Sequence, residues 1–118
     1  MQKDPRYPIG KFDKSITVTK EMRSEFINTI ETLPSLLRKE VENLSQQQLD
    51  TPYRDGGWTV KQVVHHVADS HMNAIIRFKL GLTEDNPTIR PYDENAWAQM
   101  NDTKNLPVNI SLTLLHAL

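Results

Sequence analysis

The stretch that decides the fold is WTVKQVVHHVADSH, residues 58–71, which joins a helix start to three of the chain's four histidines. Thr59 and Gln62 fit the capping-box pattern, in which each side chain bonds the backbone N–H of the other residue. Apolar side chains then recur at helical spacing, and Gly81 is a typical residue for a helix end. We therefore expect an amphipathic helix over residues 60–80.

A second apolar stripe lies before this segment. Its members follow one another at steps of three and four residues: Met22, Phe26, Ile30, Leu33, Leu37, Val41 and Leu44. That spacing lines one face of an α-helix, and Thr19 is suited to be its N-cap. Pro34 removes a backbone hydrogen bond in the middle of the stripe, which allows either one kinked helix or two shorter helices. We expect a single kinked helix, because the apolar register continues through Pro34 without a phase slip.

The remaining segments predict less regular structure. Residues 1–18 are polar with scattered turn formers, which indicates an extended arm lying over the core. After the second helix we expect a long connection with a single helical turn over residues 94–100. A final helix is expected to start near Asn109 or Ser111 and to stop at Leu118 after two turns. No strand pattern is present outside the arm.

The predicted helices do not make a complete bundle. Two long helices and a two-turn helix cannot cover one another's apolar faces as a full bundle does. We therefore expect an all-α fold that is truncated to two long helices and the start of a third. A length of 118 residues suits one core, so residues 1–118 are expected to be a single domain, the N-terminal portion of a helical bundle with its C-terminal helices missing. Two alternatives stay open: a second copy covers the open faces, or an apolar groove stays exposed.

Composition narrows the functional class. The 14 basic and 15 acidic side chains nearly cancel, which argues against nucleic acid as the main partner. Cysteine is absent, so any metal must be held by nitrogen and oxygen ligands. No apolar run approaches the roughly 20 residues that a membrane helix requires, and the N-terminus lacks an apolar signal core. We expect a cytoplasmic protein that does not interact with membranes.

On a helix that turns about 100° per residue, the histidines of residues 58–71 face different directions. His71 lies near the centre of the apolar stripe, which favours a half-buried histidine whose ring nitrogens bond backbone or water. His66 lies on the edge of the stripe beside Ser70, where it suits a ligand shared with a neighbouring helix. His65 lies well off the stripe and is expected to be exposed to solvent.

A metal site makes further demands on these side chains. A catalytic zinc site needs three protein ligands and an open fourth position. His65 and His66 point about 100° apart, and His66 and His71 about 140° apart, so a regular helix does not aim either pair at one ion. His116 is a poor source of another ligand, because it lies two residues from the chain end, where a helix frays. The remaining ligands must come from elsewhere.

Two charged residues near the histidines are further candidates. Asp69, one turn from His66, is either a partner that orients a metal ligand or a surface carboxylate. Arg77, about one turn past Asn73, either meets an acidic group of a substrate or is solvated. Residues 54–57 predict a turn before the helix in preference to an anion-binding loop.

Several blocks of the sequence resemble the YfiT family, which belongs to the larger DinB-like group. The blocks are YPIG (7–10), LDTPYRDGGWTV (49–60), QVVHHVADSHMN (62–73) and IRPYD (89–93). They occur in family order and span essentially the whole chain. The hallmark of the DinB-like group, a tryptophan and helix cap followed by a histidine eight residues on, corresponds here to Trp58 and His66.

The resemblance implies a four-helix bundle that forms a homodimer. It also implies one divalent metal per complete subunit, zinc or else nickel, held by three histidines. His66 is the ligand that the resemblance transfers to this chain, and no catalytic residue is transferred. The other two ligands belong to a His-x-x-x-His pair on the last helix of the bundle, and the 118 residues contain no such pair.

The function that this resemblance implies is a zinc-dependent hydrolase acting on a small-molecule substrate. A first alternative is a bacillithiol S-transferase, which would attach that thiol to electrophiles at the same metal site. A second alternative is a non-catalytic helical association module. Whether the chain itself is an enzyme stays open, because two of the three metal ligands are absent from it.

Overall fold

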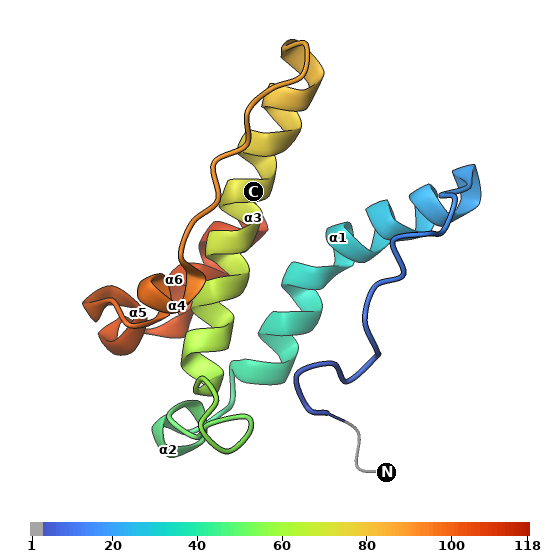
Figure 1. The fold of residues 1–118 in the computed structure, drawn as a ribbon. Helices are drawn as coiled ribbons and strands as arrows, with labels where there is room; N and C mark the ends of the chain where they lie inside the picture. The colour runs from blue at the N-terminus through green and yellow to red at the C-terminus, as the bar shows by residue number, and fades with distance from the viewer. Residues whose placement is uncertain (1–3) are drawn as a thin grey trace. The chain divides into compact units, whose positions relative to one another are not determined.

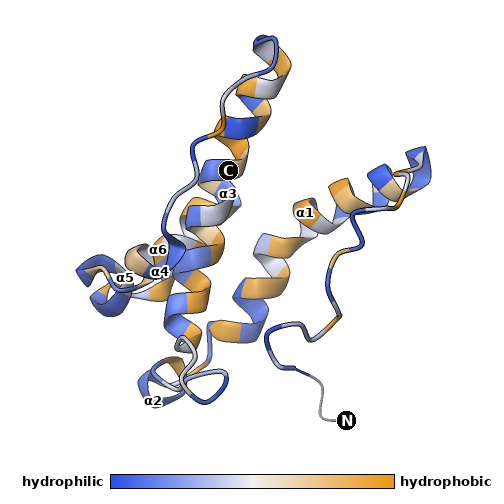
Figure 2. Cartoon of the chain, viewed as in Figure 1, coloured by the Kyte–Doolittle hydropathy of each residue, from blue (hydrophilic) through white to orange (hydrophobic). Residues whose placement is uncertain are grey.

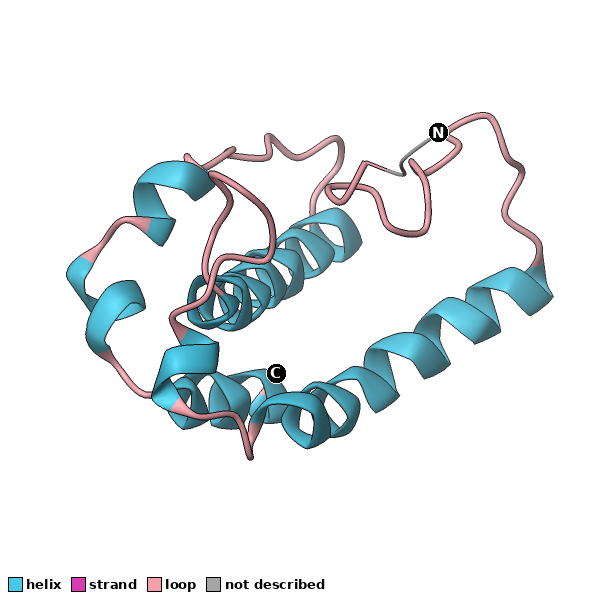
Figure 3. Cartoon of the chain, turned by 90° about the horizontal axis from the view of Figure 1, so that it is seen from below, coloured by secondary structure: helices cyan, strands magenta, loops and turns pink. Residues whose placement is uncertain are grey.

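The computed structural model describes residues 4–118, and all regular secondary structure in this part of the chain is helical (Figure 1). The helices in chain order are α1 (Lys20–Val41), α2 (Gln46–Leu49), α3 (Val60–Thr83), α4 (Glu94–Ala98), α5 (Asn101–Asn105) and α6 (Val108–Ala117). The described residues contain no strand, only an isolated bridge between Pro52 and Thr59 (Figure 3). The predicted all-α class is therefore confirmed.

The chain divides into two compact units, Met1–Thr32 and Leu33–Leu118. In the described part of the first unit, residues 4–19 form turns and irregular backbone and precede the first part of α1. The predicted arm therefore contains no strand over residues 4–18, and its first three residues lie outside the described part. The organisation of residues 1–118 as a single domain stays a prediction.

Helix α1 is continuous through Pro34, as the unbroken apolar register predicted. Thr19 caps its start, because the Thr19 hydroxyl oxygen accepts a hydrogen bond from the Met22 backbone N–H at 3.2 Å. The helix ends at Val41, three residues before the apolar stripe does. Ser45 then begins the short helix α2 with a capping box of its own, which interrupts the helical path. The kink at Pro34 stays a prediction.

Helix α3 begins at Val60, as the capping box predicted, but the predicted end at Leu80, directly before Gly81, is wrong. The helix continues to Thr83, and the Glu84 backbone N–H still donates to the Leu80 carbonyl at 2.9 Å. Gly81 is tolerated inside the helix because the backbone of glycine can also adopt helical dihedral angles. The chain instead turns at Asn86, whose φ of 53° lies in the left-handed region that asparagine adopts more readily than most residues.

The core of the second unit lies where α6 packs against α3. Its buried members come from the end of α1 and from α2, α3 and α6: Val41, Leu49, Val64, Val108 and Leu112. Figure 2 shows apolar positions along α3 and α6, which supply this core. Helix α6 starts at Val108, slightly earlier than predicted, because Pro107 holds an extended backbone conformation and serves as the N-cap residue.

The connection between α3 and α6 is more helical than predicted. The single turn expected over residues 94–100 is α4, and a further short helix, α5, follows it. Both helices pack against α3. Over residues 4–118, no helix combines the length and apolar character needed to cross a membrane.

Candidate metal centre

A tight turn delivers the chain into α3. The Gly57 backbone N–H donates to the Arg54 carbonyl at 3.0 Å, and the Tyr53 N–H donates to the Trp58 carbonyl at 3.0 Å. A Cβ on Gly57 would lie 2.6 Å from the Arg54 side chain and 3.2 Å from the Arg54 carbonyl, so this close approach requires glycine. The structure confirms that residues 54–57 form a turn, and this turn positions Trp58 at the start of the helix.

The capping box of α3 also ties this helix to α4. The Gln62 N–H donates to the Thr59 hydroxyl at 3.1 Å, and the Thr59 N–H donates to the Gln62 side-chain oxygen at 2.9 Å. The side-chain nitrogen of Gln62 donates in turn to the Ala98 carbonyl at 2.7 Å. Gln62 therefore caps the start of α3 and also bonds α4, and the two contacts together explain why its side chain is buried.

His66, the predicted metal ligand, lies on the first half of α3 and is half-buried. Its ring packs on Trp58, with ring centroids 4.8 Å apart and planes inclined by 60°. No residue in the range 4–118 hydrogen-bonds to its ring nitrogens. The tryptophan thus restricts the orientation of the imidazole while leaving its nitrogen lone pair available for a ligand.

Asp69 lies one turn further along α3 and is also half-buried. Burial raises the pKa of the Asp69 carboxyl above its ordinary value of 3.8, and the negative charge of Asp102 raises it further. His66 and then His65 act in the opposite direction. Asp69 is therefore electrostatically coupled to the candidate ligand, and its role as an orienting partner stays a prediction.

The expectation for His65 is wrong, because this residue is buried, with 5% of its surface exposed. Its Nδ1 lies 2.6 Å from the Ser111 hydroxyl, and its Nε2 lies 3.0 Å from the Leu106 carbonyl oxygen. A carbonyl can only accept, so Nε2 donates to Leu106, and in the neutral ring Nδ1 then accepts from the Ser111 hydroxyl. His65 faces α6, which covers it together with Val64, a neighbouring residue of the apolar stripe that belongs to the core. It is a structural residue and cannot be a metal ligand in this arrangement.

The other two histidines behave as the sequence predicted. His71 is half-buried, and its Nδ1 donates to the Val67 carbonyl at 2.8 Å, one turn back along α3. His116 is exposed in the last turn of α6. Neither is brought to His66, and over residues 4–118 no three histidine, aspartate or glutamate side chains form a group able to hold a metal. The described residues therefore fit a metal only as the source of one ligand.

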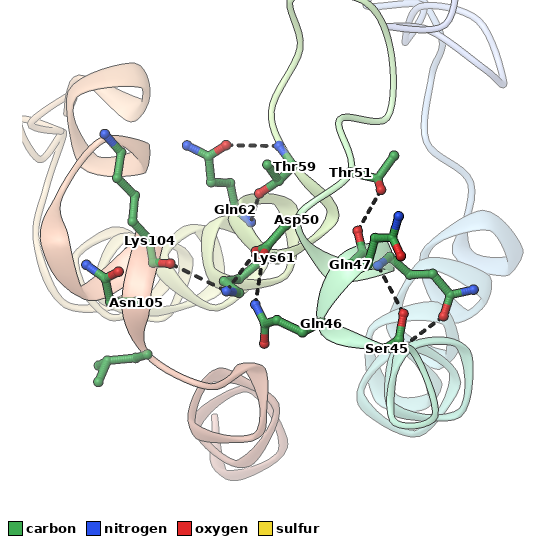
Figure 4. Close-up of polar contacts among 12 residues, drawn as sticks. Ser45, Gln46, Gln47, Asp50, Thr51, Thr59, Lys61, Gln62, Lys104 and Asn105 are labelled. Atoms are coloured by element: carbon green, nitrogen blue, oxygen red, sulfur yellow. Dashed lines mark hydrogen bonds and ion pairs between the residues drawn. The ribbon is translucent and has the colours of Figure 1, made fainter.

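A second buried polar contact, which the sequence reasoning missed, lies at the start of α3. Lys61 is 7% exposed, and its ammonium lies 2.9 Å from an Asp50 carboxylate oxygen. It also donates to the Lys104 carbonyl at 3.5 Å, so it connects α3 to α5 and to the C-cap residue of α2 (Figure 4). Hydrogen bonds from Gln46 and then Lys61 lower the pKa of Asp50. The neighbouring sequence contains no feature that predicts burial of a lysine in the first turn of a helix.

Beyond His66, a cleft of about 560 Å³ follows the second half of α3. The connection from Glu84 to Asp93 runs back beside this helix and forms the opposite wall (Figure 1). The cleft is lined by residues of α3, the connection and α4, among them Asn73, Arg77, Leu80, Arg90, Tyr92 and Trp97. Arg77, singled out from the sequence, is thus half-buried at the cleft, and it donates to the Arg90 carbonyl at 3.3 Å.

Comparison with curated proteins gives close relatives in Bacillus. A Bacillus cereus (strain AH820) protein named "Putative metal-dependent hydrolase" is 59% identical over 115 residues, which are 98% of this chain and 66% of that protein. A Bacillus mycoides (strain KBAB4) protein of the same description is 58% identical over 116 residues, with the same two coverages. The chain thus spans just under two thirds of the length of these relatives.

A solved structure shares the fold. YfiT from Bacillus subtilis, described as a probable metal-dependent hydrolase with an unusual four-helix bundle topology, matches with a TM-score of 0.91 and 52% sequence identity. The match covers 96% of this chain and 65% of YfiT. The family model described as the DinB superfamily matches residues 29–113. The resemblance predicted from the sequence blocks is therefore confirmed, and the chain belongs to the DinB superfamily.

Proposed function

We propose that this chain supplies one ligand, His66, to the metal centre of a metal-dependent hydrolase. The observation that carries the proposal is the half-buried imidazole of His66, held against Trp58 at 4.8 Å with no hydrogen bond to its nitrogens from residues 4–118. The other two buried or half-buried histidines use ring nitrogens in hydrogen bonds. Relatives named as putative or probable metal-dependent hydrolases support the functional class of the proposal.

Zinc is the metal we propose, with nickel as the second choice, and imidazole nitrogen is a common ligand for both. In a centre with an open position, zinc activates water for hydrolysis or holds a thiolate for transfer. The part of this chain is to hold and orient one ligand. Trp58 restricts the ring of His66, and Asp69 adds a carboxylate one turn away. A three-ligand centre needs two further ligands, which residues 1–118 do not provide as a His-x-x-x-His pair.

Titration of the ¹⁵N-labelled chain with zinc chloride tests the ligand assignment. Long-range ¹H–¹⁵N spectra resolve each histidine ring, and we expect the His66 nitrogens to shift before those of His65. Binding is expected to be weak, because one imidazole is only one third of a catalytic site. His66→Ala should remove the response, while His116→Ala serves as the exposed control. Equal zinc binding by the chain and by His66→Ala would refute the assignment.

Hydrolysis and thiol transfer share the ligand and differ in the nucleophile. We propose hydrolysis of a small-molecule ester or amide. A protein that combines this chain with the two further ligands should therefore release 4-nitrophenol from 4-nitrophenyl acetate in a zinc-dependent way, and EDTA or His66→Ala should abolish the release. The alternative, transfer of bacillithiol to an electrophile, is tested with monochlorobimane in the presence and absence of that thiol. Turnover that requires bacillithiol, without ester hydrolysis, would replace the hydrolase assignment by the transferase.

A separate observation favours self-association. Large apolar side chains of α1 are exposed, including Phe26 (40%), Ile30 (51%) and Leu36 (57%). Burial of such side chains in a dimer would remove apolar surface from water. We propose a homodimer of a cytoplasmic protein, with a purely associative role as the second alternative function. Sedimentation velocity should give a concentration-dependent dimer, and a monomer at all concentrations would contradict this proposal.

A further inference from the structure

The cleft beside the second half of α3 combines an apolar wall with aromatic side chains. Ile76 and Leu80 contribute the α3 side, and Ile89 and Pro91 the side of the returning connection. The rings of Tyr92 and Trp97 pack together with centroids 4.5 Å apart. A volume of about 560 Å³ falls within the range of small-molecule sites, which combine apolar lining with a few placed polar groups.

The charged groups of the cleft favour an anion. Arg77 uses one guanidinium N–H on the Arg90 carbonyl, and its remaining donors have no carboxylate partner among residues 4–118. Arg90 lines the same cleft and adds a second positive charge. The acid of the cleft, Asp93, accepts from the Ala96 N–H at 2.9 Å as the cap of α4 and forms no ion pair with either arginine. The cleft therefore carries a net positive charge, and a guanidinium fork suits a carboxylate.

The cleft also lies on the face of α3 that carries His66. Asn73 and Arg77 follow His66 by seven and eleven residues, and at about 100° per residue both fall within roughly 20° of it around the helix. At about 1.5 Å per residue they lie about 10 and 16 Å along the axis. The proposed anchor Arg77 and the candidate metal ligand His66 therefore lie on the same face of α3.

We propose that this cleft binds a small carboxylate with an aromatic or bulky apolar body, anchored by Arg77 and packed on Tyr92 and Trp97. The inference adds a ligand class to the proposed function and rests on that function only where the ligand is called a substrate. Binding itself needs no metal. The cleft and the metal centre can therefore be tested separately.

Phenylacetate is the probe, and its neutral analogue phenylacetamide is the matched comparison. The metal-free chain is titrated with each in EDTA, and the indole N–H signals are followed by ¹H–¹⁵N spectra. Trp97 in the cleft should shift, while Trp58 serves as the internal reference. We expect phenylacetate to bind about ten-fold more tightly than phenylacetamide, because its carboxylate can form a charge-assisted hydrogen bond with Arg77.

Substitutions distinguish the role of Arg77 as the anchor from general effects of a substitution on the protein. Arg77→Gln should reduce phenylacetate binding to the level of the amide, while Arg23→Gln, an exposed arginine of α1, should leave it unchanged. His66→Ala should also leave it unchanged, so loss of the metal ligand and loss of the cleft are distinguishable. The proposal is overturned if the two probes bind equally, if Arg77→Gln keeps the preference, or if neither probe shifts Trp97.

Discussion

His65 and His66 are adjacent in the chain and have different surroundings because they face different sides of α3. His65 faces α6, where both ring nitrogens are used in hydrogen bonds to Ser111 and Leu106. His66 faces Trp58 and keeps its nitrogens available among the described residues. A metal ligand must offer a lone pair, so of these two neighbouring histidines only His66 is left in surroundings that permit the proposed ligand role.

His65→Ala should strongly destabilise the second unit. The substitution leaves the Ser111 hydroxyl and the Leu106 carbonyl without their partner and opens a cavity between α3 and α6. We expect the free energy of unfolding to fall by about 2–4 kcal/mol. Urea denaturation measures this, and His116→Ala, at an exposed position, should change it by less than about 0.5 kcal/mol. Equal effects of the two substitutions would contradict the structural role of His65.

Asp69 should make the protein less stable as its carboxyl ionises. The folded-state pKa is raised, so the folded chain binds the proton more tightly than the unfolded chain does. The loss of stability that ionisation causes is therefore absent below the ordinary pKa of 3.8. It grows as the pH rises from there through the raised pKa of the folded state. Asp69→Asn should raise the melting temperature at pH 7, and the gain should disappear near pH 3.

The exposed Asp85 provides the control, since Asp85→Asn should leave the melting temperature unchanged. Removing the neighbouring charge by Asp102→Asn should lower the pKa of Asp69, which carboxyl ¹³C NMR can follow. A melting-temperature gain in Asp69→Asn that is the same at pH 3 and pH 7 would rule out the ionisation as its cause.

At the scale of elements, the sequence specifies the start of α3 more strongly than its end. Its start has a capping box with both reciprocal hydrogen bonds, so local chemistry places it at Val60. Its end has no comparable signal, and Gly81 is followed by two more helical residues. Glycine permits a helix end without requiring one, because its φ can also remain helical.

Gly81→Ala should stabilise the protein. The position is helical, and a Cβ there would meet no atom within 4 Å. Because alanine loses less backbone entropy in a helix, we expect a gain of up to about 0.5–1 kcal/mol in the free energy of unfolding by urea. Gly57→Ala is the opposing case, because its Cβ would lie 2.6 Å from the Arg54 side chain, and it should destabilise. A loss of stability in Gly81→Ala would show that the helix ends before this residue.

At the scale of the whole molecule, the stability of the second unit depends on contacts between segments distant in sequence. Helix α6 packs on α3 through Leu112, which is 2% exposed, and the buried polar groups of Lys61, Gln62 and His65 bond to carbonyls or side chains of other elements. Short helices such as α4 and α5 have little stability alone, so α3 acts as the support on which they form.

Leu112→Ala should test this dependence directly. Removing a fully buried leucine costs about 2–5 kcal/mol when the surrounding residues cannot close the cavity. Leu114→Ala, two residues away on α6 and 37% exposed, is the matched control and should cost much less. Chemical denaturation of both variants gives the comparison, and similar losses would show that α6 is not the core partner of α3.

The sequence predicted the features that depend on neighbouring residues. The start of α3, its capping box, the continuity of α1 through Pro34 and the half-buried state of His71 all follow from residues within one or two turns, where side-chain chemistry and helical periodicity decide the outcome. The sequence blocks likewise indicated the superfamily.

Only the tertiary structure decided which polar side chains are buried. His65 meets partners 46 and 41 residues away, and Gln62 meets a carbonyl 36 residues away. A helical wheel shows one apolar face, but it does not show that a later helix will also cover residues beyond the edge of that face and supply hydrogen bonds there. The same reason separates His65 from His66. Local sequence places both on one helix, and packing by α6 buries His65 while the ring nitrogens of His66 stay without a hydrogen bond from residues 4–118.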